Sequence, residues 1–171
     1  SGNNRYRYTC ILTAPGEYTS HLGGTSAANS ALITTINRVS QIYERDFSIR
    51  LVFFTSNIYT NAATDPFTNG GEINATTLDE NQADVVANYF EDQYDFGHVI
   101  TRGPGTGGIG DIDSVCDAPT KFRGGSGSPD PVGDAFNVDY VAHEIGHQFG
   151  GYHTFDDCEG STQRTSIAAY E

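Results

Sequence analysis

The segment His143-Glu144-Ile145-Gly146-His147 carries the residue types with the clearest chemical potential in the chain. If this segment is helical, its two histidines lie one turn apart on one face, about 5–6 Å from each other. Two imidazoles at that separation can bind one tetrahedral zinc ion. Glu144 then projects beside the metal rather than onto it, where it can take a proton from a water molecule. The spacing therefore predicts a catalytic zinc site.

The residues that follow this segment indicate a third ligand. Gly150 comes three residues after His147, and a glycine with positive φ can end the helix and turn the chain back sharply. That turn brings His153 to the third ligand position and leaves the fourth position open, as in catalytic zinc sites. The five fixed positions occur by chance in a chain of this size on the order of once in ten thousand. We predict His143, His147 and His153 as the zinc ligands and Glu144 as the catalytic base.

The elements that must position these residues follow from the periodicity of the apolar residues. A helix over residues 138–149 should carry the metal motif, because apolar residues recur there at steps of three and four. The pattern elsewhere predicts strands over residues 5–13, 47–54 and 98–101, and helices over residues 25–45 and 78–94. Strands that alternate with helices favour a single three-layer α/β domain over residues 1–171.

The polar and glycine-rich segments are expected to connect these elements. Residues 55–77 and 124–133 read as loops, and residues 103–110 as a surface loop or a bulged edge strand near a cleft. Residues 103–110 lack the Lys-Ser/Thr of a phosphate-binding loop, which excludes that interpretation. Two histidines stand apart from the motif: His21 is expected in a loop, and His98 as a core residue with its hydrogen bonds satisfied.

The composition excludes several classes of function. The formal net charge of −13 argues against nucleic acid and anionic membranes as partners, because both require clustered Lys and Arg. No apolar run is long enough to span a membrane. Calcium binding by some of the carboxylates is an alternative to a plain solvated surface. The chain has no D-x-[DN]-x-[DN]-G loop, however, so the sequence locates no calcium site.

The three cysteines, Cys10, Cys116 and Cys158, are sparse and odd in number. Their spacing matches neither a zinc ribbon nor a redox CxxC motif, so structural disulfides of unassigned pairing are expected, with one partner outside this chain. The chain opens at Ser1 without an initiator Met, which predicts that an upstream segment has been removed. Together these features lead us to expect a secreted protein.

The segment HEIGHQFGGYH resembles the zinc signature HExxHxxGxxH of the metzincin metallopeptidases. Residues 16–19, 37–46 and 95–99 are similar to bacterial reprolysin-like (adamalysin-related) peptidases, so the likeness covers nearly the whole chain. His153, Thr154 and Phe155 followed by Cys158 also resemble the pappalysins, a sister family and our second choice.

The resemblance implies a twisted mixed sheet with two long helices and a cleft beneath an edge strand. A peptide substrate would pair with that strand, within residues 107–115. The implied activity is zinc-dependent hydrolysis of peptide bonds in extracellular proteins. Two alternatives stay open: a noncatalytic binding or adhesion module on the metzincin frame, and a zinc hydrolase that acts on a non-peptide bond.

One feature departs from the metzincin pattern. Metzincins carry a methionine-containing turn downstream of the third histidine, whereas this chain has no Met and ends at Glu171. We expect a domain truncated before the Met-turn, with its C-terminal subdomain largely missing. The missing segment, or a second chain, would then supply the Met-turn and a partner for one of the three cysteines.

Overall fold

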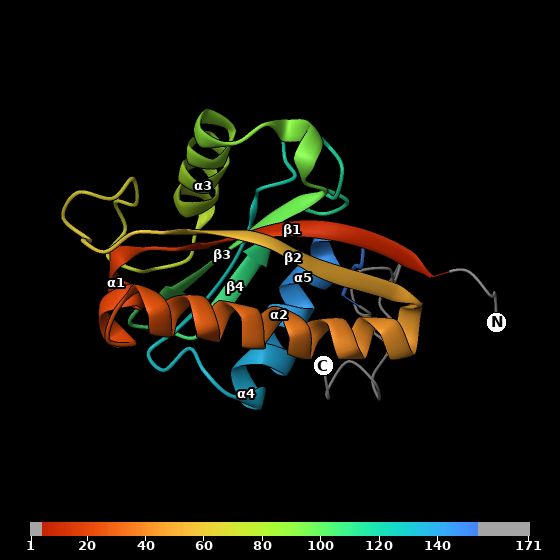
Figure 1. The fold of residues 1–171 in the computed structure, drawn as a ribbon, viewed down its shortest axis with the longest axis horizontal. Coiled ribbons are helices and arrows are strands. Elements are labelled where there is room, and N and C mark those ends of the chain that lie inside the picture. The colour runs from red at the N-terminus through yellow and green to blue at the C-terminus, as the bar shows by residue number, and fades with distance from the viewer. Residues whose placement is uncertain (1–4, 154–171) are drawn as a thin grey trace, which may run out of the picture.

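The computed structural model describes residues 5–153, which form an α/β domain around a five-stranded sheet (Figure 1). The strands lie in the order β2-β1-β3-β5-β4, with three parallel pairings and an antiparallel pairing of β4 with β5. The sheet is therefore mixed, as expected, and β4 lies at one edge. The strands are β1 (Tyr6–Ala14), β2 (Ile49–Ile58), β3 (Phe96–Arg102), β4 (Gly107–Gly110) and β5 (Gly124–Ser128).

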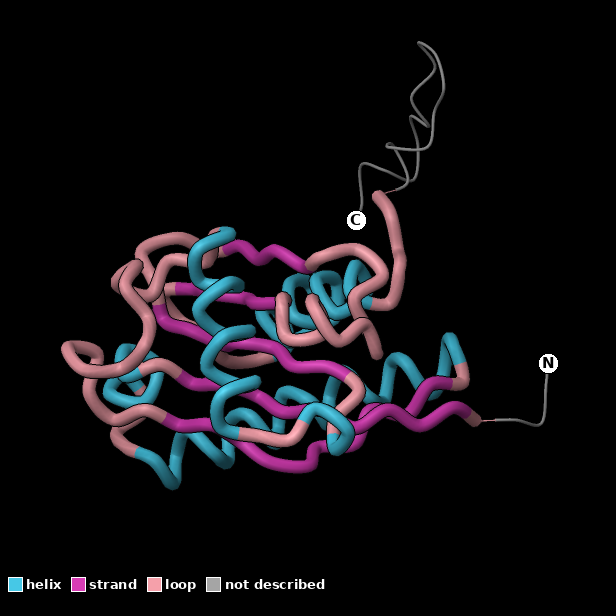
Figure 2. The backbone as a smooth tube through the Cα atoms, turned by 90° about the horizontal axis from the view of Figure 1, so that it is seen from above, coloured by secondary structure: helices cyan, strands magenta, loops and turns pink. Residues whose placement is uncertain are grey.

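Helices cover both faces of this sheet and produce the predicted three layers (Figures 1 and 2). The long helix α2 (Thr25–Phe47) covers one face, and α3 (Ala75–Asn88) lies on the other. Because side chains alternate along a strand, β1 contributes Leu12 to the core beneath α2 and Ile11 to a smaller core near α3. The second half of β1, from Cys10 to Ala14, is thus buried on both faces.

The metal motif lies on a helical segment that packs against α2. This segment comprises α4 (Asp134–Phe136), a π-helical turn at Asn137–Val141, and α5 (Ala142–Gln148). The Tyr43 hydroxyl donates a hydrogen bond of 2.7 Å to the Ala142 carbonyl, where α5 begins. The buried Thr35 hydroxyl donates to the Asn137 side chain at 2.9 Å. These contacts anchor the start of the metal-binding helix on the longest helix of the domain.

Several predicted boundaries were wrong. His21 lies not in a loop but in a short helix, α1 (Gly16–His21), whose first amide donates to the Asp65 carboxylate at 2.7 Å. Strand β2 continues to Ile58, four residues into the predicted loop. Helix α3 begins at Ala75 because Asn74 caps it in a capping box, and it ends at Asn88 rather than at residue 94. Beyond that end, Phe90 is exposed instead of facing the core.

The segment at 124–133 was the largest error, because its first half is the buried strand β5. Glycine favours loops, but here it permits close packing: a Cβ at Gly124 would lie 2.2 Å from the Gln148 amide oxygen. A Cβ at Gly125 would lie 2.7 Å from Val99 on the neighbouring strand. Of the two expectations for residues 103–110, the edge strand is right for Gly107–Gly110.

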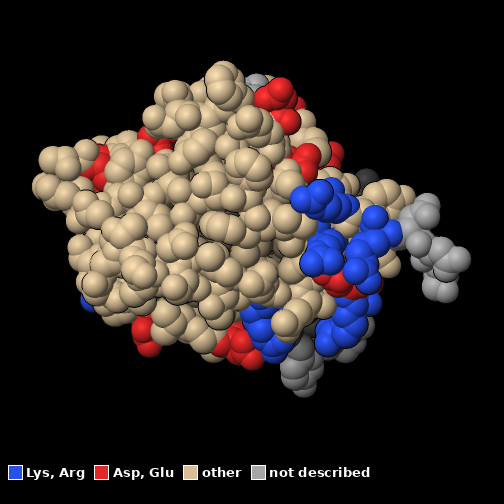
Figure 3. Space-filling model, in the orientation of Figure 1, with Lys and Arg blue, Asp and Glu red and all other residues tan. Residues whose placement is uncertain are grey.

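The charge distribution, the apolar character of the helices and the state of the cysteines can be compared with the sequence predictions. Most of the positive side chains visible in Figure 3 gather at the end of the molecule where β1 and β2 begin, and there Arg5 and Arg50 share the Glu44 carboxylate. No helix within residues 5–153 is long and apolar enough to cross a membrane. Cys10 is buried and Cys116 exposed, and they form no disulfide with each other; Cys158 lies outside the described residues.

Candidate metal centre

The chain reverses direction directly after α5, as the glycine predicted. Gly150 has φ of +87°, and its amide donates to the His147 carbonyl at 2.8 Å. The Gly151 amide donates to the Gly146 carbonyl at 2.9 Å. This pair of hydrogen bonds is a Schellman motif, which ends the helix at a left-handed residue. The turn returns the chain toward α5 and places His153 beside the two helical histidines.

The three predicted ligands converge with their Nε2 atoms. The Nε2 atoms of His143, His147 and His153 lie 3.1 Å from one another. Nitrogen ligands at about 2.0–2.1 Å from a tetrahedral zinc ion would be about 3.3–3.4 Å apart, so the triangle suits that ion. The His147 Nδ1–H donates to the Gly151 carbonyl at 2.7 Å, which leaves its Nε2 lone pair for the metal. The donor set and its spacing therefore fit zinc.

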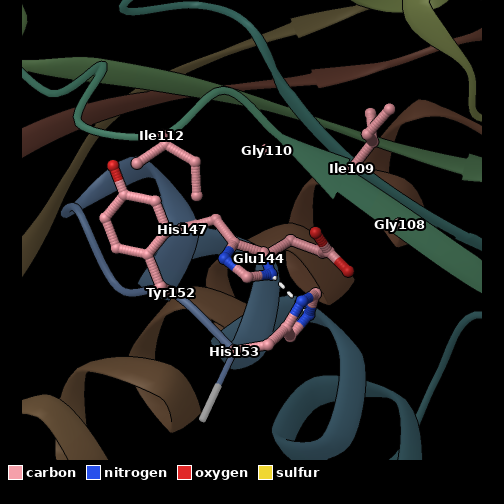
Figure 4. Close-up of a pocket in the computed structure, with 8 residues that line it drawn as sticks. All are labelled: Gly108, Ile109, Gly110, Ile112, Glu144, His147, Tyr152 and His153. Carbon is pink, nitrogen blue, oxygen red and sulfur yellow. Dashed lines mark hydrogen bonds between the residues drawn. The ribbon is translucent and has the colours of Figure 1, made fainter. Parts of the chain in front are cut away.

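Glu144 lies beside the histidines and not among them. It is 7 % exposed, and its carboxylate projects into the pocket beside the His147 and His153 rings (Figure 4). Burial raises the pKa of Glu144 from 4.5 to about 7. A divalent cation held by the histidines would oppose this shift, because a nearby positive charge favours the ionised carboxylate.

The pocket around these residues lies between α5 and the edge strand β4 and has a volume of about 540 Å³. Gly108 faces Glu144 so closely that a Cβ there would be 2.2 Å from the Glu144 Cγ. Ile109, Ile112 and Tyr152 give the rim an apolar character, and all three are exposed. The lining residues are Gly108, Ile109, Gly110, Ile112, Glu144, His147, Tyr152 and His153 (Figure 4).

A second layer of hydrogen bonds supports the end of α5. The Asp113 amide donates to the His147 carbonyl, and the Val115 amide to the Gln148 carbonyl, each at 3.1 Å. The segment between β4 and β5 thus caps carbonyls that a helix end leaves without intrahelical partners. Sequence analysis missed this role, because nothing in the composition of residues 111–117 indicates a helix cap.

His98 is a satisfied core residue, as predicted. It is fully buried, its Nδ1 lies 2.9 Å from the Gln148 side-chain oxygen, and its Nε2 lies 3.0 Å from the Ser126 hydroxyl. Sequence analysis missed Gln148 as its partner. The available signal was a glutamine at an inward-facing position of an amphipathic helix, where an apolar residue is usual.

Burial of His98 should make the fold sensitive to acid. Desolvation lowers the pKa of His98 from 6.5 to about 4. The unfolded chain therefore binds a proton below about pH 6.5, whereas the folded chain does not until about pH 4. The stabilisation is present above pH 6.5 and is lost as the pH falls toward 4, by about 2–3 kcal/mol at pH 4.5.

Urea unfolding of the metal-free protein at pH 7 and pH 4.5, with His98→Asn alongside, measures this effect. The parent should lose about 2–3 kcal/mol more than the variant on acidification. Parallel losses would show that another group dominates the acid sensitivity.

Comparison with known proteins identifies the family. A sequence model of metallopeptidase family M12B, reprolysin-like, matches residues 29–154. No curated protein matches the chain significantly. A solved chain from a chaperone–substrate complex has the same fold, with a TM-score of 0.64 and 20 % sequence identity over 93 % of this chain. The match covers only 25 % of the length of that solved chain.

The family match covers most of the long helix α2, four of the five strands and the whole metal motif, whereas the pappalysin alternative stays a prediction. The match also agrees with the mixed sheet and the converging histidines described above. Members of this family are zinc metallopeptidases. The chain therefore belongs to the reprolysin-like M12B family of metzincin metallopeptidases.

Proposed function

We propose that this chain is the catalytic part of an endopeptidase that cleaves extracellular proteins, with zinc held by His143, His147 and His153. The observation that carries the proposal is the convergence of the three Nε2 atoms at a pocket that Glu144, His147 and His153 line. An open metal position beside a carboxylate is the arrangement that peptide hydrolysis requires. The family supports the metallopeptidase class, and the cysteines support an extracellular location.

The proposed roles follow from the positions of the side chains. Zinc, when bound, supplies Lewis acidity that polarises a scissile carbonyl and lowers the pKa of a water molecule. Glu144 takes the proton of the attacking water and then delivers it to the leaving amine. Glu144 is buried against Gly108, and this desolvation favours its protonated form, which can donate to the leaving amine. The charge of a bound metal favours its ionised form, which can accept the proton of the water.

Strand β4 offers a surface for an extended substrate. Within the described part of the chain it pairs with β5 along one side only, and its other side borders the pocket. Three of its four residues are glycine, so a peptide backbone can approach it closely. We propose that the substrate adds to β4 as a strand, which aligns the scissile bond along the pocket.

We propose that a further segment completes the site. Because none of the 171 residues is a methionine, the Met-turn expected beneath the metal would come from another segment of the protein or from a second chain. We place the partner of one cysteine in the same segment. Calcium forms no part of the proposal.

The test is hydrolysis of a library of quenched peptides with and without a zinc chelator. We expect cleavage at internal bonds, loss of cleavage with 1,10-phenanthroline, and recovery after zinc is restored. The 1,7 isomer, which does not chelate, is the matched control. A folded, zinc-loaded protein that binds peptides but cleaves none would favour the noncatalytic binding module. Hydrolysis of esters alone would favour the non-peptide hydrolase.

A further inference from the structure

We propose that Gln148, held in place by His98, is a positioning residue for the metal centre. Its buried side chain docks the last turn of α5 on the sheet and so fixes His147 relative to His153. The inference rests on the three-histidine metal site of the proposed function but not on peptide cleavage. Neither Gln148 nor His98 lines the pocket.

The Gln148 side chain is held from two sides. It is fully buried, and its amide nitrogen donates to the Gly97 carbonyl at 3.0 Å. Its amide oxygen, 2.9 Å from the His98 Nδ1, therefore faces the imidazole as an acceptor. The backbone carbonyl of Gln148 accepts from the Val115 amide as well. Three hydrogen bonds from two separate segments, β3 and the loop at Val115, thus fix a single residue of the helix end.

These partners also fix the tautomer of His98. Since the Gln148 oxygen can only accept, the proton of the neutral ring lies on Nδ1, and Nε2 accepts from the Ser126 hydroxyl at 3.0 Å. Burial holds the ring neutral at neutral pH, because it lowers the pKa of His98 to about 4. The donor that orients Gln148 is therefore present under ordinary conditions.

The sheet is shaped to admit this amide. A Cβ at Gly124 would lie 2.2 Å from the Gln148 oxygen and 2.7 Å from its nitrogen, so the glycine of β5 leaves the space that the side chain occupies. A buried amide costs free energy unless every polar atom finds a partner, and a leucine or methionine would fill such a space without that requirement. Unlike an apolar side chain, the amide forms directional hydrogen bonds, and these fix one orientation of the end of α5.

Gln148 stands between two ligands along the chain. His147 precedes it directly, and the Schellman turn that returns His153 begins two residues later at Gly150. The relation between His147 and His153 depends on the backbone of residues 148–152, whereas His143 and His147 are related by the helix alone. A shift of Gln148 should therefore disturb the ligand triangle, as the loss of an outer-shell partner does in metal sites.

Two substitutions of His98 separate positioning from packing. An asparagine amide reaches the place of Nδ1 and keeps the donor to Gln148, whereas a glutamine amide reaches the place of Nε2 and keeps the contact to Ser126. Each loses one buried hydrogen bond, so their stabilities should fall by similar amounts. Zinc affinity, measured by competition with a chromophoric chelator, should fall about 10–100-fold in His98→Gln. It should stay within about threefold of the parent in His98→Asn.

Two further variants complete the design. Gln148→Met, which keeps the volume and removes both polar atoms, should weaken zinc binding as His98→Gln does. Ser126→Ala, which loses a hydrogen bond on the far side of the ring, should leave zinc affinity unchanged. Equal zinc affinities in the two His98 variants, or parent-like affinity in Gln148→Met, would overturn the inference. A parent that binds zinc but cleaves no peptide would refute the proposed peptidase and leave this inference standing, whereas one that binds no zinc would refute both.

Discussion

Glu144→Gln should lower kcat for peptide hydrolysis by about 10²–10⁴-fold while the protein keeps its zinc. The amide has the shape of the carboxyl group and fits against Gly108 in the same way, but it cannot accept the proton of the attacking water. The Nε2 atoms of the three imidazoles cannot replace it, because they face the metal position.

The measurement for this variant combines steady-state kinetics on a quenched peptide with zinc analysis of the same sample. Glu144→Asp is the matched comparison, since it retains the carboxylate but withdraws it by one methylene. We expect Glu144→Asp to keep more activity than Glu144→Gln. Parent-like turnover in Glu144→Gln would remove Glu144 from the role of general base, and loss of zinc would instead make it a determinant of the metal site.

The sequence predicts those features of the site that depend on residues close together in the chain. His143 and His147 are one helical turn apart, and the backbone geometry of a helix alone sets their separation. Gly150 indicates the turn, because the Schellman motif requires a residue that tolerates positive φ. The position of His153 then follows from three residues of chain, so the ligand triangle is predictable without knowledge of the sheet.

The remaining features depend on segments far apart in the sequence. The glycines of β5 read as loop because the sequence does not reveal that Gln148, Val99 and Ile73 occupy the space their side chains would take. The partnership of His98 with Gln148 joins residues 50 positions apart. Helix α3 was misplaced for a different reason, since Phe90 has the apolar character of a core residue but lies exposed beyond the helix end. Tertiary packing thus overrides local propensity.

Gly108→Ala should lower kcat/KM by about 10²-fold or more, although position 108 carries no functional group. An alanine Cβ would lie 2.2 Å from the Cγ, 2.7 Å from the Cδ and 2.8 Å from the Oε1 of Glu144. The carboxylate must leave its place or β4 must move away from α5, and either displacement separates the base from the metal. Gly105→Ala is the matched control, because a Cβ at that position, two residues before β4, meets nothing within 4 Å.

A double-mutant cycle decides whether Gly108→Ala acts through Glu144. In the parent, overpacking against the glutamate should cost about 1–3 kcal/mol of the free energy of unfolding, measured in urea. In the Glu144→Ala background the clashing atoms are gone, so the same substitution should be nearly neutral. An equal cost in both backgrounds would place the conflict in the backbone of β4 instead. Coupling would show that the glycine of the edge strand exists to make room for the base, which ties the composition of β4 directly to the chemistry of the pocket.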